Sequence, residues 1–212
     1  MRRESSTVVA LVGEVSRALL AGLARSANVS VVRRAVGHAQ QGADEAPARD
    51  ESGTGVARPH SDWEAGASAL REAARRRSTY VIVPDDPLTA VAAAWRAMWE
   101  LSGESAAFEE RAAEALAAWQ DKQFELPDYY LVVAASPAAG LGQDLYLGPL
   151  RAARPGRVAV AVAGDSDAEA TRLADTLRSL EHGPWWPPLG ELLDAARHFY
   201  ADGLAETQHV PA

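Results

Sequence analysis

Cysteine is absent from the 212 residues of this chain. Its absence excludes disulfides, thiolate zinc sites, iron–sulfur clusters and a cysteine nucleophile, and it fits a reducing compartment. Two further features are missing: a run of about 20 apolar residues that could span a bilayer, and a cleavable signal sequence. We therefore expect a cytoplasmic protein that is not inserted in a membrane.

Basic residues, and lysine above all, are scarce. Lys122 is the only lysine, and it lies in a polar segment without a glycine-rich loop, which argues against a Schiff base or a P-loop. The chain has 29 acidic and 21 basic residues, a net charge of −8. Because nucleic-acid binding requires clustered cations, this balance argues against a nucleic-acid partner.

Short segments rich in β-branched residues alternate with longer segments of helical periodicity. The first kind predicts five strands, at residues 8–12, 29–36, 80–83, 129–134 and 157–163. Several of these are apolar throughout, which is typical of parallel strands covered on both faces. The pattern predicts one α/β domain over residues 1–212, with a Rossmann-like, doubly wound, mostly parallel sheet and helices on both faces.

Two segments depart from this alternation. Residues 37–61 have almost no large apolar side chain, so we expect a flexible insertion there. Residues 137–156 contain an apolar centre and should instead be ordered, as a loop over the strand ends. Within this loop, Pro149 is expected to start a short helical turn that ends before Pro155 and Gly156.

Acidic and hydroxyl side chains follow the predicted strands. Ligands of open α/β sheets bind at the carboxyl ends of the strands, and these residues are therefore the candidate ligand-binding set: Glu14, Ser16, Asp85, Asp86, Ser136, Asp165 and Asp167. If strands one, three and five are close neighbours, the acids could hold Mg²⁺ together with a phosphate-bearing substrate. Helix capping is the favoured explanation, because Asp86 precedes a proline and Ser166 to Glu169 form a capping box. We therefore predict no metal site and no cofactor, with Mg²⁺ as the alternative.

Established catalytic and nucleotide-binding motifs are incomplete. The first predicted strand ends at a single glycine, Gly13, where a dinucleotide fold requires three, and Glu14 beside it would repel a phosphate. No Gly-x-Ser-x-Gly motif occurs. The spacing of the five histidines indicates no pairing with a serine. No motif identifies a family.

Aromatic residues provide candidates for contact with a partner. Trp185 and Trp186 precede two prolines, in a segment that must turn. Neighbouring side chains in a turn diverge, so we expect one ring to be buried and the other to be partly exposed. An exposed tryptophan beside rigid prolines is a plausible contact point. The candidate partner-binding residues are Trp185, Trp186 and Tyr146.

Two functions of different class are consistent with these observations. The favoured one is a non-catalytic accessory or regulatory domain that binds a protein partner, which includes self-association, or a small ligand. The alternative is an enzyme that acts on a small, phosphorylated or unphosphorylated, substrate with acidic residues at the strand ends.

Overall fold

One all-parallel sheet organises the chain in the computed structural model, which describes residues 6–13, 15–32, 62–100, 105–134, 145–162, 167–180 and 183–207. The strand order is β2-β3-β1-β4-β5. The central strand β1 pairs with β3 on one side and with β4 on the other. The strands are β1 (Thr7–Gly13), β2 (Val29–Val31), β3 (Tyr80–Val83), β4 (Tyr129–Ala134) and β5 (Val158–Val162).

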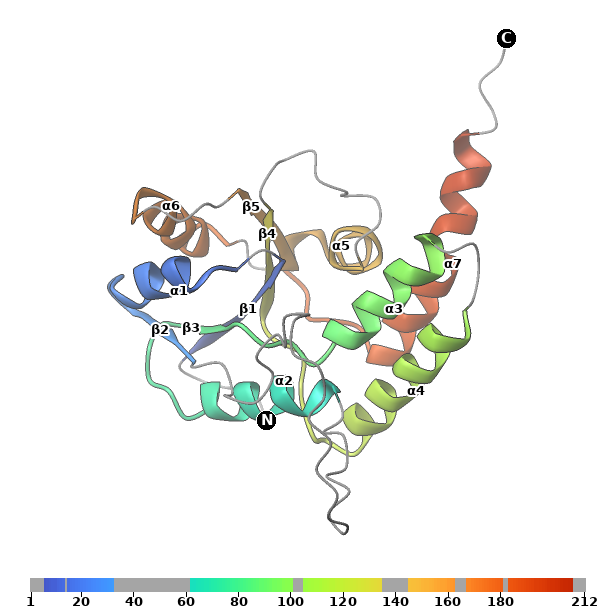
Figure 1. Cartoon of the computed structure of the whole chain (residues 1–212), viewed down its shortest axis with the longest axis horizontal. Helices are drawn as coiled ribbons and strands as arrows, with labels where there is room; N and C mark the ends of the chain where they lie inside the picture. Colours follow the sequence, from blue (N-terminus) through green and yellow to red (C-terminus); the bar gives the residue numbers. More distant parts are fainter. Residues whose placement is uncertain are drawn as a thin grey trace, which may run out of the picture.

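Helices cover both faces of this sheet, and the doubly wound α/β fold predicted from the sequence is confirmed (Figure 1). Among the described residues, no helix is long and apolar enough to cross a membrane. The helices are α1 (Arg17–Ala24), α2 (Asp62–Ala73), α3 (Thr89–Glu100), α4 (Ala106–Gln120), α5 (Arg151–Ala153), α6 (Asp167–Arg178) and α7 (Leu189–Thr207).

The alternation of side chains along β1 divides the core into two layers. Val8, Ala10 and Val12 pack in one layer with residues of α2, α3, α4 and α7. Val9 and Leu11 point to the opposite face and pack in the other layer with residues of α1 and α6. Each strand residue therefore buries its side chain on one face or the other, which explains why these strands are apolar throughout.

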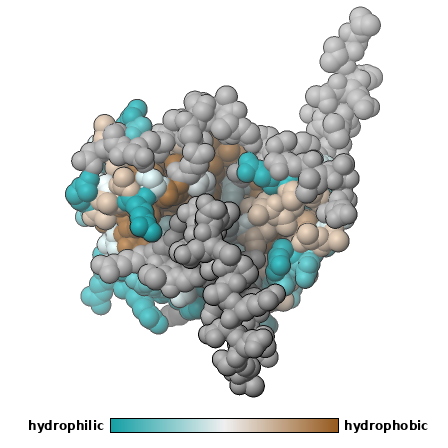
Figure 2. Space-filling model, viewed as in Figure 1, coloured by the Kyte–Doolittle hydropathy of each residue, from teal (hydrophilic) through white to brown (hydrophobic). Residues whose placement is uncertain are grey.

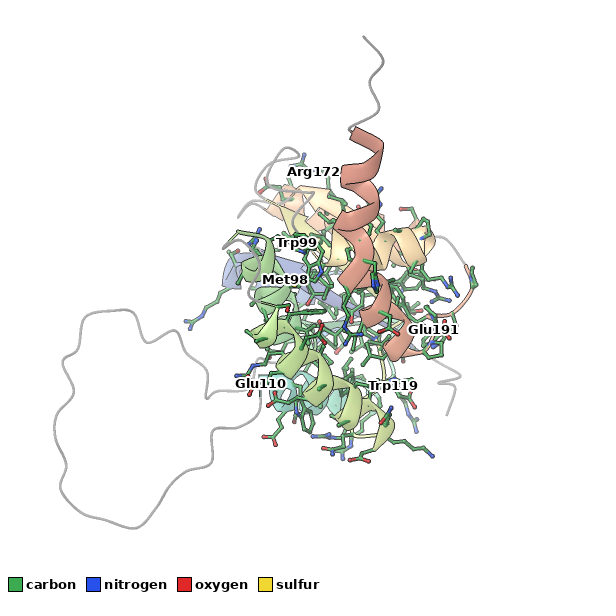
Figure 3. The ribbon with its side chains drawn as sticks, turned by 90° about the vertical axis from the view of Figure 1, so that its right-hand side faces the viewer. Met98, Trp99, Glu110, Trp119, Arg172 and Glu191 are labelled. Atoms are coloured by element: carbon green, nitrogen blue, oxygen red, sulfur yellow. The ribbon has the colours of Figure 1, made fainter. Side chains whose placement is uncertain are left out.

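The thicker layer contains three helices, α3, α4 and α7, that pack against one another (Figure 3). The indole nitrogen of Trp95 on α3 donates to the carbonyl oxygen of Ala196 on α7, at 2.9 Å. Arg197 on α7 binds the carboxylate of Glu109 on α4 through its Nε and Nη2 atoms. The first contact holds α3 against α7, and the second holds α4 against α7.

The expected elements are found with small changes in length. Of the strand expected at residues 29–36, Val29–Val31 forms β2, and residues 33–36 lie outside the described residues. The expected flexible insertion, residues 37–61, also lies outside them, as do residues 137–144 of the expected ordered loop. Residues 145–157 form a π-helical turn (Tyr146–Leu150), the short helix α5 and a 3₁₀ turn (Pro155–Arg157).

The prediction that Pro149 starts a helical turn is wrong. The turn begins at Tyr146, and Pro149 lies inside it. The wide turn is closed by the amide of Leu150, which donates to the carbonyl oxygen of Leu145 at 3.1 Å. Pro149 still lies in the first turn, where a backbone N–H has no partner within the helix, so the missing donor costs nothing.

Candidate functional site

A cavity of about 140 Å³ lies at the carboxyl end of β1. The chain leaves β1 toward α1 on one face of the sheet and leaves β3 toward α3 on the other face (Figure 1). Connections that diverge in this way leave a crevice at the strand ends, which is where open α/β sheets bind ligands. The residues that line the cavity are Leu11, Val12, Gly13, Val15, Pro84, Thr89, Ala92 and Tyr146.

Backbone of the β1–α1 connection forms one wall of this cavity. Gly13 has a φ angle of +100°, and a Cβ atom at this position would overlap the carbonyl oxygen of Val133 on β4. Only glycine combines this φ angle with such a close approach. Ser16 caps α1, because its Oγ accepts a hydrogen bond from the amide of Leu19 at 3.1 Å. The predicted site residue Ser16 therefore has a structural role beside the cavity.

The opposite wall is positioned by a buried carboxylate, Asp86, between β3 and α3. Asp86 is 3% exposed and accepts three hydrogen bonds. Its Oδ2 accepts from the Tyr146 hydroxyl at 2.7 Å and from the Leu88 amide at 3.1 Å. Its Oδ1 accepts from the Tyr130 hydroxyl at 3.1 Å. Thr89 is tied to the same turn, since its hydroxyl donates to the Asp86 carbonyl oxygen at 2.8 Å.

Burial changes the acidity of this cluster. Desolvation raises the pKa of Asp86 from 3.8 to about 6, although the hydrogen bonds from Tyr146, Tyr130 and Leu88 act in the opposite direction. Burial also raises the pKa of Tyr130 well above its usual value, and the adjacent Asp86 carboxylate adds to that effect. The Tyr130 phenol therefore stays protonated near neutral pH, while Asp86 titrates just below it.

The capping interpretation of Asp86 agrees with this geometry, because the Leu88 amide lies in the turn that leads into α3. Asp85, the preceding candidate, is half-buried in the same turn. Helix α2 contacts this turn closely, because a Cβ atom on Gly66 would overlap the backbone of Asp86 and Pro87. The turn is thus fixed by hydrogen bonds from one side and by helix packing from the other.

Among the candidates that the structure describes, Asp167 lies apart from this cluster. The Mg²⁺ alternative required β1, β3 and β5 to be close neighbours. Strand β4 separates β1 from β5, so this condition is not met. Asp167 begins α6, which follows β5 at the far side of the sheet. In the part of the chain that the structure describes, no group of three or more histidine, aspartate or glutamate side chains could hold a metal ion. Three candidates, Glu14, Ser136 and Asp165, lie outside that part.

The three aromatic candidates occupy different places. Trp185 is 47% exposed, whereas Trp186 is 5% exposed and its indole nitrogen donates to the Pro127 carbonyl oxygen at 2.8 Å. One buried and one exposed ring is the arrangement expected from the sequence. Tyr146, expected at a partner surface, is 5% exposed and lines the cavity instead. Its hydroxyl is drawn inward because a buried carboxylate requires donors.

Sequence reasoning missed two residues, Tyr130 and Arg157. Tyr130 lies within an apolar strand, where its ring packs between those of Tyr146, at 5.0 Å, and Trp186, at 5.6 Å. A tyrosine inside a buried strand was itself a signal, because a buried hydroxyl requires a partner. Arg157 is 9% exposed and precedes β5. It therefore lies at the amino ends of the strands (the amino edge of the sheet), whereas the cavity lies at their carboxyl ends (the carboxyl edge). An arginine that precedes an apolar strand gives no comparable signal.

No family model matches the chain, and the comparisons with curated proteins and with solved structures found no match.

Proposed function

We propose that this protein is a binding domain that holds a small ligand, or one small group of a larger ligand, in the cavity at the carboxyl end of β1. The observation that carries the proposal is the cavity itself, which lies at the crevice between the β1–α1 connection and α3. On the face shown in Figure 2, the most hydrophobic residues lie to the left of and above the centre, with hydrophilic residues on both sides of them.

The size of the cavity limits the ligand. Its volume of about 140 Å³ is close to that of cavities of about 150 Å³ that accept benzene. It is smaller than the roughly 300–1,000 Å³ of sites that enclose drug-sized molecules. The proposed occupant is therefore one six-membered ring or a group of similar size.

The lining favours a neutral or cationic ligand that donates hydrogen bonds. The hydroxyl protons of Tyr146 and Thr89 are both used by Asp86, so each oxygen offers only its acceptor capacity. The other lining side chains among the described residues are apolar. Asp86 is mostly ionised at pH 7, because its pKa is about 6, and its charge opposes the entry of an anion. This electrostatic argument also reduces the support for a phosphorylated substrate.

The enzyme alternative rests on a different observation, the raised pKa of Asp86 beside the cavity. A buried acid that titrates near neutral pH is common in active sites. Here, however, three donors fill both carboxylate oxygens, and Tyr146 lies between Asp86 and the cavity. The geometry therefore supports binding better than proton transfer by Asp86.

The test is a blocked cavity with a matched control. Ala92 lines the cavity, whereas Ala93 is the next residue of α3 and is exposed. We expect phenol, imidazole and benzylamine to shift amide resonances around Gly13 and Thr89 in the wild type and in Ala93→Met, but not in Ala92→Met. Benzoate and inorganic phosphate should give no shifts. The proposal fails if none of the three donors binds, or if Ala92→Met binds them as the wild type does.

A further inference from the structure

Trp185 lies at the amino edge of the sheet, opposite the cavity. It is the one large apolar side chain that is exposed among the described residues, at 47%. The guanidinium of Arg157 packs over its ring at 4.8 Å, and the same guanidinium packs over the ring of Tyr129 at 4.9 Å. Arg157 also donates to the carbonyl oxygens of Pro184 and Gly183. The exposed ring is thus held in place before any partner binds.

Two arginines, Arg154 and Arg157, contact Trp185, and a third, Arg151, precedes Arg154 in the same short segment. Arg154 donates from Nε to the Trp185 carbonyl oxygen at 2.6 Å, and Arg151 is exposed in the preceding turn. None of Arg151, Arg154 and Arg157 forms an ion pair within the described part of the chain. Five arginines elsewhere do pair with acids (Arg76, Arg111, Arg172, Arg178 and Arg197), whereas Arg75 and Arg77 after α2 resemble the three arginines near Trp185 in forming no ion pair with a described residue. A local positive patch in a chain of net charge −8 is the feature to explain.

We propose that the surface formed by Trp185, Arg154 and Arg151 binds an acidic segment of a partner protein, in which carboxylates flank an apolar side chain. Tryptophan and arginine are the residues most enriched among those that dominate binding energy at interfaces. Arg154 is held by bonds from Nε and Nη1 to the carbonyl oxygens of Trp185 and Ala153, and the guanidinium charges of Arg154 and the exposed Arg151 attract carboxylates. Trp185, with exposed Pro184 beside it, supplies a rigid apolar contact.

The same features disfavour a nucleic acid as the partner. A polyanion needs a track of cations along its backbone, whereas the cations near Trp185 are Arg151 and Arg154 on one short segment and Arg157, which is only 9% exposed. The net charge of −8 would repel a long polyanion. A short acidic peptide needs only local complementarity.

The experiment follows the indole N–H signal of Trp185 in the full chain, assigned with the variant Trp185→Phe. The probe is the blocked pentapeptide EELEE, with KKLKK as the charge-reversed control. We expect EELEE to shift the Trp185 signal with a Kd below about 1 mM, and KKLKK to leave it unchanged. The shift should weaken as salt is added, because the contacts are ionic and exposed.

Charge variants test whether EELEE binds this surface or is attracted to positive charge anywhere on the protein. Arg151→Gln combined with Arg154→Gln should weaken the binding of EELEE at least about tenfold. Arg75→Gln combined with Arg77→Gln removes the same charge from an exposed segment after α2 and should leave binding unchanged. The proposal is overturned if EELEE gives no shift, if both double variants bind alike, or if an eight-nucleotide oligothymidylate shifts Trp185 at a lower concentration than EELEE.

Discussion

The carboxyl edge and the amino edge of the sheet, where the parallel strands end and begin, each bury a charged side chain that forms no ion pair with another described residue. At the carboxyl edge, Asp86 is held by one amide and two phenol hydroxyls. At the amino edge, Arg157 is held by three carbonyl oxygens, those of Asp128, Gly183 and Pro184, and by two aromatic rings. In both places the dipoles of neutral groups offset the cost of removing a charge from water.

The difference between the edges lies in what can change with pH. Asp86 has a pKa of about 6, so a modest acidification neutralises it. Arg157 keeps its charge at every accessible pH, because a guanidinium is not deprotonated in proteins. The charge at the carboxyl edge therefore changes with pH and lies behind a cavity, whereas the charge at the amino edge is permanent and supports an exposed ring. At both edges a buried charged side chain holds a loop through hydrogen bonds, and the two loops position different surfaces.

Truncation of the two neighbouring tryptophans should produce the largest contrast at the amino edge. Trp186→Ala removes packing against Tyr130 and the hydrogen bond to Pro127, and should lower the free energy of unfolding by about 3–5 kcal/mol. Trp185→Ala removes an exposed ring and its contact with Arg157, and should cost about 1 kcal/mol or less. Urea unfolding of both variants measures the difference. Similar losses in the two would show that the exposed ring is structural.

A methyl group added to α2 should disrupt the carboxyl edge next most strongly. In Gly66→Ala the new Cβ would overlap backbone atoms of Asp86 and Pro87, which cannot rotate away, so we expect a loss of about 3 kcal/mol. Gly190→Ala is the matched control, because its Cβ would lie 3.8 Å from a Leu116 methyl carbon, an ordinary contact. Thermal unfolding should show Gly190→Ala to be as stable as the wild type or slightly more so. Equal stability of the two variants would mean that α2 does not clamp this turn.

The sequence predicts the fold well, because periodicity reflects burial. The strand at residues 80–83 is apolar on both faces, and the structure forms β3 over the same residues. The strand expected at residues 29–36 is tested over its first residues only, where Val29–Val31 form the edge strand β2 and are half-buried, since an edge strand has a neighbour on one side only. Strand order could not be predicted, since nothing local to β5 indicates that β4 separates it from β1.

The site was predicted in part. Asp86 stands out in the sequence because it precedes a proline at a strand end, and capping follows from that pattern. Its partners Tyr130 and Tyr146 lie 44 and 60 residues away, and no local pattern links them. Arg157 makes its contacts with residues 26–29 positions away. A buried charge satisfied by distant neutral groups is visible only once the chain has folded.

Replacement of the titratable group should alter how stability depends on pH at the carboxyl edge. The folded-state pKa of Asp86, about 6, lies above the ordinary value of 3.8, so the folded state binds the proton more tightly. The resulting stabilisation is complete below pH 3.8 and is lost as the pH rises through 6, by roughly 3 kcal/mol at most. The unfolding free energy of the wild type minus that of Asp86→Asn should therefore decrease between pH 4 and pH 7.

Asparagine is a suitable replacement because it remains a competent N-cap for α3. The subtraction also removes the contributions of other groups that titrate over this range, provided that they are unaffected by the substitution. Tyr146→Phe gives a further check, because it removes one donor to Asp86 without removing the ring. The loss of that donor should raise the pKa of Asp86 further. A difference between wild type and Asp86→Asn that is flat from pH 4 to pH 7 contradicts the assignment.

The smallest effect is expected when the permanent charge at the amino edge is removed. Arg157→Gln keeps one donor for the backbone carbonyls but loses the others and the contacts with Tyr129 and Trp185. It also relieves the cost of a buried charge, so the net loss should be about 2 kcal/mol. Arg154→Gln, whose Nε bond to Trp185 is exposed, should cost about 0.5 kcal/mol. Unlike the Asp86 comparison, the loss in Arg157→Gln should be the same at pH 5 and pH 8, because arginine does not titrate. A pH-dependent loss would show that an acid near Arg157 shares its charge, and the contrast between the two edges would then fail.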